Sequence, residues 1–130
     1  MVCLVLMNVP RISYLDFSAD DPKRAVDFYT KVFGWQINKW DGPREYWEIK
    51  TGDLNELGID GGLSKREKIG QWTTPFINVS SVDQYTAKIK SGGGKIIESK
   101  TAIPKIGYTL LFKDTENNTI GLFEENKDAE

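Results

Sequence analysis

The chain has 130 residues, of which 39% are hydrophobic and 12% aromatic, and its 17 basic and 19 acidic side chains leave a formal charge of −2. These values fit one folded domain and exclude a disordered tail. The charges are scattered along the chain, so we expect neither nucleic acid nor a membrane surface as a partner. There is no histidine, which excludes Ser-His-Asp and Cys-His relays and removes the commonest ligand of transition metals.

Residues 1–7 are interpreted as an N-terminal extension. Their apolar run is much shorter than the ~20 residues of a membrane-spanning helix, and no cleavable signal peptide is recognisable. The only cysteine, Cys3, cannot form a disulfide within the chain, so the sequence favours a cytoplasmic protein. We expect Cys3 to be inert and leave Met1 and Met7 as alternative native starts.

The first half of the chain predicts one strand, one helix and three further strands. Residues 12–19 alternate in polarity and indicate a strand. An acidic cap and Pro22 then begin an amphipathic helix, which Gly34 ends. The three remaining strands are predicted at residues 35–40, 44–51 and 57–63.

The second half repeats this order. A strand is predicted at residues 73–79, and Ser80 or Ser81 can cap a helix that the glycines at 92–94 terminate. Three more strands are predicted at residues 95–100, 107–113 and 118–124. Aligning Tyr14 with Thr74 places Gly34 on Gly94 without a gap, so the pattern indicates two βαβββ modules about 60 residues apart.

We therefore expect an α+β fold in which the two modules form a curved mixed sheet around a cavity. A single domain would cover residues 8–125, with modules at about 10–66 and 72–124 and a frayed tail at 126–130. Each helix would cover one sheet face, and strand alternation assigns alternate side chains to the bare face. The predicted ligand-binding residues on that face are Tyr14, Asp16, Asp60, Thr74, Asn78 and Phe123.

Four segments carry a family resemblance: SADDPKRAVDFYTKVFGW, GIDGGL, IPKIGY and FKDTENNTIGLFE. Over about residues 10–125 the chain resembles the vicinal oxygen chelate superfamily, which contains glyoxalase I, bleomycin-resistance proteins and extradiol dioxygenases. The resemblance implies the same two-module fold. It also implies that the four metal-ligand positions of metal-dependent members correspond here to Tyr14, Gly62, Thr74 and Gly121. None of these is a usual metal ligand, so we expect no metal and no other cofactor.

Three side chains are candidate catalytic groups. Asp16 and Asp60 could form a carboxylate pair with one raised pKa, or an unusual all-oxygen metal site, or they could be partly solvated and bonded to neighbouring strands. Tyr14 could donate a hydrogen bond to a bound carbonyl, stack on a flat ligand, or only fill the space of a metal. The aromatics expected near the cavity edge, which suit core or interface as well as ligand contact, are Trp40, Tyr46, Trp47 and Trp72.

The sequence leaves three functional hypotheses. The first is a metal-free homodimer that binds a small organic molecule in the cavity between its modules. The second is a metal-independent lyase or isomerase that uses Asp16, Asp60 or Tyr14. The third is a non-catalytic accessory or sequestering protein that acts through its surface.

Overall fold

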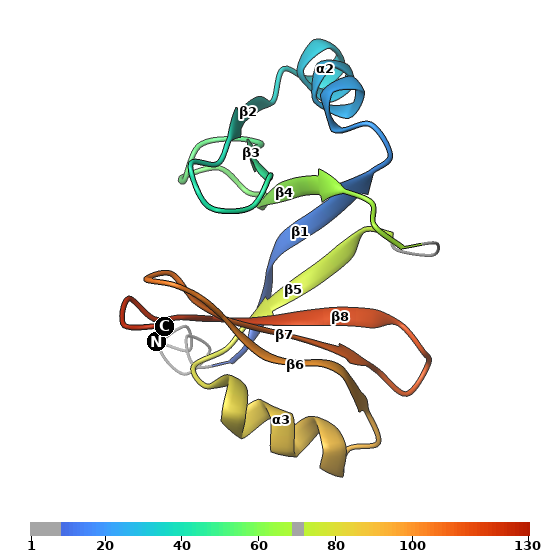
Figure 1. Cartoon of the computed structure of the whole chain (residues 1–130), viewed down its shortest axis with the longest axis vertical. Coiled ribbons are helices and arrows are strands. Elements are labelled where there is room, and N and C mark those ends of the chain that lie inside the picture. Colours follow the sequence, from blue (N-terminus) through green and yellow to red (C-terminus); the bar gives the residue numbers. More distant parts are fainter. Residues whose placement is uncertain (1–8, 69–71) are drawn as a thin grey trace. The chain divides into compact units, whose positions relative to one another are not determined.

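The computed structural model describes residues 9–68 and 72–130, so the expected extension with Cys3 and Met7 lies outside the described residues. The chain divides into two compact units (Figure 1). The N-terminal unit is Tyr14–Thr74, and the C-terminal unit combines Pro75–Glu130 with the segment that ends at Ser13. No helix in the described part of the chain is long and apolar enough to cross a membrane.

Each unit has one helix and a four-stranded mixed sheet, which confirms the α+β class and the βαβββ order. Within each sheet one neighbouring pair is parallel, β1 with β4 or β5 with β8. The N-terminal unit has the strand order β2 (Gln36–Lys39), β3 (Trp47–Lys50), β4 (Asp60–Lys65), β1 (Arg11–Ala19). The C-terminal order is β5 (Thr74–Asn78), β8 (Thr119–Glu125), β7 (Gly107–Lys113), β6 (Lys95–Ile103).

Helix α2 (Pro22–Phe33) begins and ends as its sequence predicts. The Asp21 side chain accepts a hydrogen bond from the Arg24 N–H at 3.2 Å, which satisfies one free donor of the first turn. Gly34 ends the helix with a φ of 72°, a left-handed conformation that glycine adopts without strain. The apolar side of α2 contacts a core whose buried members are Ala19, Trp47, Ile49 and Leu63.

Helix α3 (Val82–Ser91) covers the sheet of the C-terminal unit. Of the two candidate caps, Ser81 is the one used, because its side chain accepts from the Gln84 N–H at 3.1 Å. The Glu124 carboxylate adds a second contact, since it accepts from the Val82 N–H at 2.9 Å. An anion at a helix N-terminus is favourable, so this contact fastens α3 to the last strand. The buried core consists of Val79, Val82, Leu110 and Leu122.

The start of strand β4 and the C-terminal tail differ from what the sequence predicts. Strand β4 begins at Asp60 rather than near Leu57, because residues 51–59 form a loop in which the Thr51 hydroxyl donates to the Ile59 carbonyl at 2.6 Å. The chain end, which we expected to fray, instead contacts the β6–β7 turn. There Ala129 is 2% exposed and its carbonyl accepts from the Lys105 N–H at 2.9 Å. The tail therefore supplies an acceptor for the Lys105 N–H and, through the Asn126 N–H, a donor for the Ile106 carbonyl.

We predict that Leu63→Ala lowers the free energy of unfolding by about 2–5 kcal/mol, because it opens a cavity beside Trp47 and Ile49. Leu57→Ala is the matched control, since the Leu57 side chain is fully exposed. Urea unfolding of both variants measures the effect. Equal losses in the two variants would contradict the assignment of this core.

Candidate functional site

The sheet face of the N-terminal unit that lies opposite α2 carries two rows of side chains that cross the strands. Along β3 the burial alternates, with Trp47 and Ile49 buried and the residues after each exposed. Strand pairing then aligns residues across the sheet. The first row is Asn38, Glu48, Gly62 and Asp16, and the second is Gln36, Lys50, Asp60 and Tyr14.

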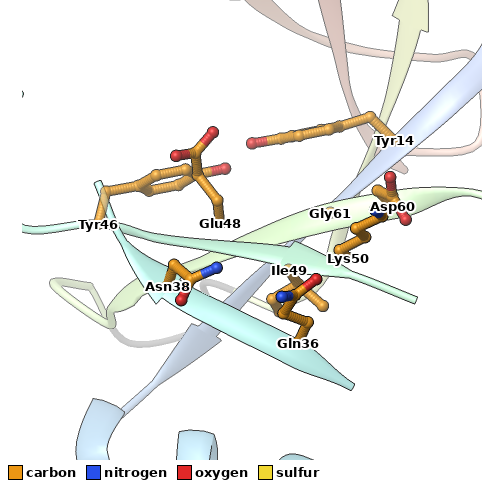
Figure 2. Close-up of a pocket in the computed structure, with 9 residues that line it drawn as sticks. All are labelled: Tyr14, Gln36, Asn38, Tyr46, Glu48, Ile49, Lys50, Asp60 and Gly61. Atoms are coloured by element: carbon orange, nitrogen blue, oxygen red, sulfur yellow. The ribbon is translucent and has the colours of Figure 1, made fainter. Parts of the chain in front are cut away.

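A pocket of about 330 Å³ lies over these rows. This volume falls in the lower range of small-molecule sites. Figure 2 shows the hydroxyl ends of Tyr14 and Tyr46 near the Glu48 carboxylate, with Lys50 and Asp60 in another part of the pocket. The lining residues are Tyr14, Gln36, Asn38, Tyr46, Glu48, Ile49, Lys50, Asp60 and Gly61.

The two tyrosine hydroxyls meet above Gly62. A Cβ placed on Gly62 would collide with the Tyr46 hydroxyl and would stand 2.7 Å from the hydroxyl of Tyr14. Both phenols therefore occupy the space into which any side chain at position 62 would project. Only glycine leaves room for this arrangement at a residue that is itself buried.

Asp16 lies beside Gly62 on the neighbouring strand β1, and its carboxylate is bonded to Tyr46. The Tyr46 hydroxyl donates a hydrogen bond to Asp16 Oδ1 at 3.0 Å. Burial raises the pKa of Asp16 to about 6, and the Arg44 guanidinium opposes that rise. Burial and the nearby Glu48 carboxylate also raise the pKa of Tyr46. The pair therefore holds a carboxyl group that titrates near neutrality beside a phenol that keeps its proton.

Asp60 has other partners. Its Oδ1 accepts from the Thr51 N–H at 2.8 Å and from the Thr51 hydroxyl at 3.3 Å. Asp60 lines the pocket, whereas Asp16 reaches it only through Tyr46. The two carboxylates thus have different hydrogen-bond partners, Tyr46 for Asp16 and Thr51 for Asp60. A pairing of Asp16 with Asp60 stays a prediction.

Four polar side chains of the pocket make no hydrogen bond or ion pair with any other described residue: Gln36, Asn38, Glu48 and Lys50. They come from the two adjacent strands β2 and β3. Polar groups without a protein partner in a concave site are available to a ligand. None of the four was among the ligand-binding residues predicted from the sequence, although alternation within residues 36–39 and 47–50 places them on the bare face.

The remaining predicted ligand-binding residues do not line this pocket. The Thr74 hydroxyl donates to the Trp72 carbonyl at 3.4 Å. In the C-terminal unit, Asn78 is exposed and lies opposite Phe123 in the β5–β8 pair. The Phe123 ring lies 3.0 Å from the point where a Cβ on Gly107 would stand. A role for these residues in binding stays a prediction.

The residues at the four family ligand positions do not fit a divalent metal. Gly62 and Gly121 offer no donor, and a Cβ on Gly121 would collide with the Phe76 ring just as one on Gly62 would collide with Tyr46. Aromatic groups thus fill the space that ligand side chains would need. Among the residues that the structure describes, no three Asp, Glu or Cys side chains gather as a metal site.

The other aromatics have different surroundings. Trp47 is a buried core residue. Trp40 contacts Tyr46 edge to face, with ring centroids 6.2 Å apart, and so supports the phenol from outside the pocket. Trp72 is 66% exposed. The Arg66 guanidinium lies over its ring, with Cζ 4.9 Å from the ring centroid.

The comparison with protein families matches residues 11–122 to the Glyoxalase/Bleomycin resistance protein/Dioxygenase superfamily. The chain belongs to this superfamily. It is 24% identical over 120 residues to proteins called "Putative glyoxylase CFP32" from Mycobacterium bovis and Mycobacterium tuberculosis. The match covers 88% of this chain but 46% of each relative, so the chain spans about half of their length.

Solved structures share the fold of this superfamily member. A hypothetical protein from Bacillus halodurans has a TM-score of 0.70 and 12% identity, over 94% of this chain and 99% of that one. Methylmalonyl-CoA epimerase from Mycobacterium tuberculosis has a TM-score of 0.66 and 12% identity, over 88% of this chain and 87% of that one. Likeness at this identity is a likeness of fold and carries no activity with it.

We predict that Gly62→Ala lowers the free energy of unfolding by about 1–3 kcal/mol, because the new methyl group displaces the Tyr46 ring. In a Tyr46→Ala background the same substitution should cost less, since the colliding hydroxyl is gone. A double-mutant cycle followed by urea unfolding measures the coupling. Additive effects of the two substitutions would contradict the contact.

The Asp16 carboxyl gives a second prediction. Its pKa rises from an ordinary 3.8 to about 6 in the folded chain, so the folded state binds this proton more tightly than the unfolded state does. Its contribution to stability therefore falls as pH rises from about 4 to about 6. Asp16→Asn keeps an acceptor for Tyr46 but cannot ionise.

We expect this variant to be more stable than the original chain at pH 7–8 by up to about 3 kcal/mol, with the difference shrinking toward pH 4. Urea unfolding of both proteins at several pH values measures it. A difference that does not vary with pH would show that Asp16 is not ionised against a burial cost.

Proposed function

We propose that this chain binds a small organic molecule in the pocket of the N-terminal unit. The observation that carries the proposal is the group of pocket side chains with no partner among the described residues, Gln36, Asn38, Glu48 and Lys50. Amide, carboxylate and ammonium groups at one site can fix the orientation of a polar ligand. The pocket volume suits a molecule of metabolite size.

We further propose that binding needs no divalent metal. Two of the four family ligand positions are glycines whose side-chain space is filled by Tyr46 or Phe76. A metal site needs several converging donors at about 2.0–2.6 Å, so two missing donors cannot be replaced by small adjustments. The phenols above Gly62 supply hydrogen-bonding groups where a ligand side chain would otherwise lie.

Acid–base catalysis is the second candidate function. Asp16 titrates near neutrality, as a general acid or base requires, and Tyr46 connects it to the pocket. A proton would have to pass from the ligand to the Tyr46 oxygen while the Tyr46 proton moves to Asp16. The enzyme name of the mycobacterial relatives favours testing this candidate. It predicts turnover that Tyr46→Phe abolishes and Asp16→Asn abolishes as well.

We expect native mass spectrometry of the untagged protein to show the chain without stoichiometric metal. A thermal-shift screen against a broad metabolite set should give ligands that raise the melting temperature equally with and without EDTA. One metal equivalent per chain would overturn the metal-free proposal. The same spectrum reads the number of subunits, and so tests the homodimer expected from the sequence.

A matched pair of variants locates the binding. Asn38→Ala removes a pocket side chain, and Lys39→Ala changes the next residue of β2, which does not line the pocket. We expect the ligand-induced shift to shrink in the first variant and to persist in the second. No thermal shift with any compound, for a protein that unfolds cooperatively, would overturn small-molecule binding and leave the accessory role.

A further inference from the structure

One end of the pocket offers hydrogen-bond acceptors. A tyrosine hydroxyl has a single proton, and the Tyr46 proton is directed to Asp16 Oδ1. The lone pairs of the Tyr46 oxygen are therefore what this group can present to a ligand. Glu48, which lies in the same cross-strand row as Asp16, adds a carboxylate with no other described partner. Asn38 stands opposite Glu48 and can add its carbonyl oxygen.

The charge around this end is also negative. Figure 2 shows the Glu48 carboxylate beside the Tyr46 ring, and Asp16 lies on the far side of the Tyr46 hydroxyl. Lys50, the cation among the lining residues, belongs to the other row, where Asp60 follows it on β4. A carboxylate ligand would meet the Glu48 carboxylate and the lone pairs of Tyr46, and so an unfavourable potential, at the Tyr46 end. A protonated amine would find acceptors, negative charge and aromatic faces.

We propose that the end of the pocket formed by Tyr46, Glu48 and Asn38 binds the protonated amino group of the ligand, and that protonation of Asp16 weakens this binding. The inference rests on the proposed small-molecule function and names its ligand class. When Asp16 takes up a proton, its negative charge is lost. The protonated carboxyl can then donate to the Tyr46 oxygen, which turns the Tyr46 proton toward the amine.

Burial raises the pKa of Asp16 and the Arg44 guanidinium opposes that rise, while other titratable groups lie on the surrounding strands. Asp16 is on β1, and no side chain separates it from the phenols on the β4 side because its neighbour there is Gly62. The burial that raises the pKa of Asp16 to about 6 places its titration between pH 5 and 8. Arg44 and Tyr46 lie before β3, Glu48 on β3 acts on Tyr46, and the Tyr14 hydroxyl shares the space above Gly62. The Asp60 carboxylate on β4 is bonded to Thr51 instead.

Three probes of nearly equal shape test the ligand class: benzylamine, benzyl alcohol and benzoate. Titrations of the full chain followed by two-dimensional ¹H–¹⁵N spectra report both affinity and the amides affected. At pH 8 we expect benzylamine to bind at least about tenfold more tightly than either control, a factor that corresponds to about one charge-assisted hydrogen bond. The shifted amides should include those of Tyr46, Glu48 and Gly62.

Lowering the pH from 8 to 5 tests the link to Asp16, because an alkylammonium group stays charged across this range. We expect the affinity for benzylamine to fall about tenfold in the original chain and to change less than about twofold in Asp16→Asn. Glu48→Gln should bind more weakly at both pH values yet keep the pH dependence. That variant separates the titration of Asp16 from that of Glu48.

The outcomes distinguish the two proposals. Binding of benzyl alcohol or benzoate at these amides as tightly as benzylamine would overturn the amine inference while supporting small-molecule binding. An affinity for benzylamine that does not change with pH in the original chain would overturn the role of Asp16. If no probe binds and the metabolite screen is also negative, the proposed function itself fails.

Discussion

The arrangement of the candidate site depends on the missing side chain at Gly62. A strand residue in the middle of a sheet normally projects its Cβ onto one face, and at this position that space holds the hydroxyls of Tyr46 and Tyr14. The phenols can therefore lie close to the sheet, and Tyr46 can reach across β4 to Asp16 on the neighbouring strand. Any larger residue would lift Tyr46 from the sheet and would separate the hydroxyl from the carboxylate. The missing side chain at Gly62 therefore makes room for the pocket wall, for the Tyr46–Asp16 hydrogen bond and for the burial of Asp16.

Burial of the Asp16 carboxyl lowers the stability of the folded chain. An ionised Asp16 exchanges water for one phenol hydrogen bond and the charge of the Arg44 guanidinium, and burial raises its pKa. A core built only for stability would place an apolar residue there. Asp60, two residues from Gly62 on the same strand, shows the ordinary arrangement, because its carboxylate is exposed and closes a local turn with Thr51. The contrast between the two aspartates agrees with the role that we propose for Asp16 beside the pocket.

The sequence predicted the fold because local and global signals agree. Asp21, Pro22 and Gly34 mark the ends of α2, and the repeat of that pattern sixty residues later predicts the second module. Alternation also placed Tyr14, Asp16 and Asp60 on the bare face. It could not identify the Tyr46–Asp16 hydrogen bond, since the two residues are 30 positions apart and Tyr46 precedes β3 rather than lying in it. It also could not show that Ala129 contacts the β6–β7 turn, because this contact depends on which backbone groups of the turn remain unpaired.

In each unit an aromatic ring occupies the side-chain space of one buried glycine. Gly62 is covered by Tyr46, and Gly121 is covered by the Phe76 ring from the neighbouring strand β5. The two glycines are buried and lie next to the fully packed leucines Leu63 and Leu122. A donor side chain at either position would have to displace a ring from a packed strand pair, which destabilises the fold. One added donor would not offset this loss, because the other glycine would still supply no metal ligand. A donor side chain at both glycine positions would therefore require paired changes in each unit, and single substitutions along that route should be destabilising.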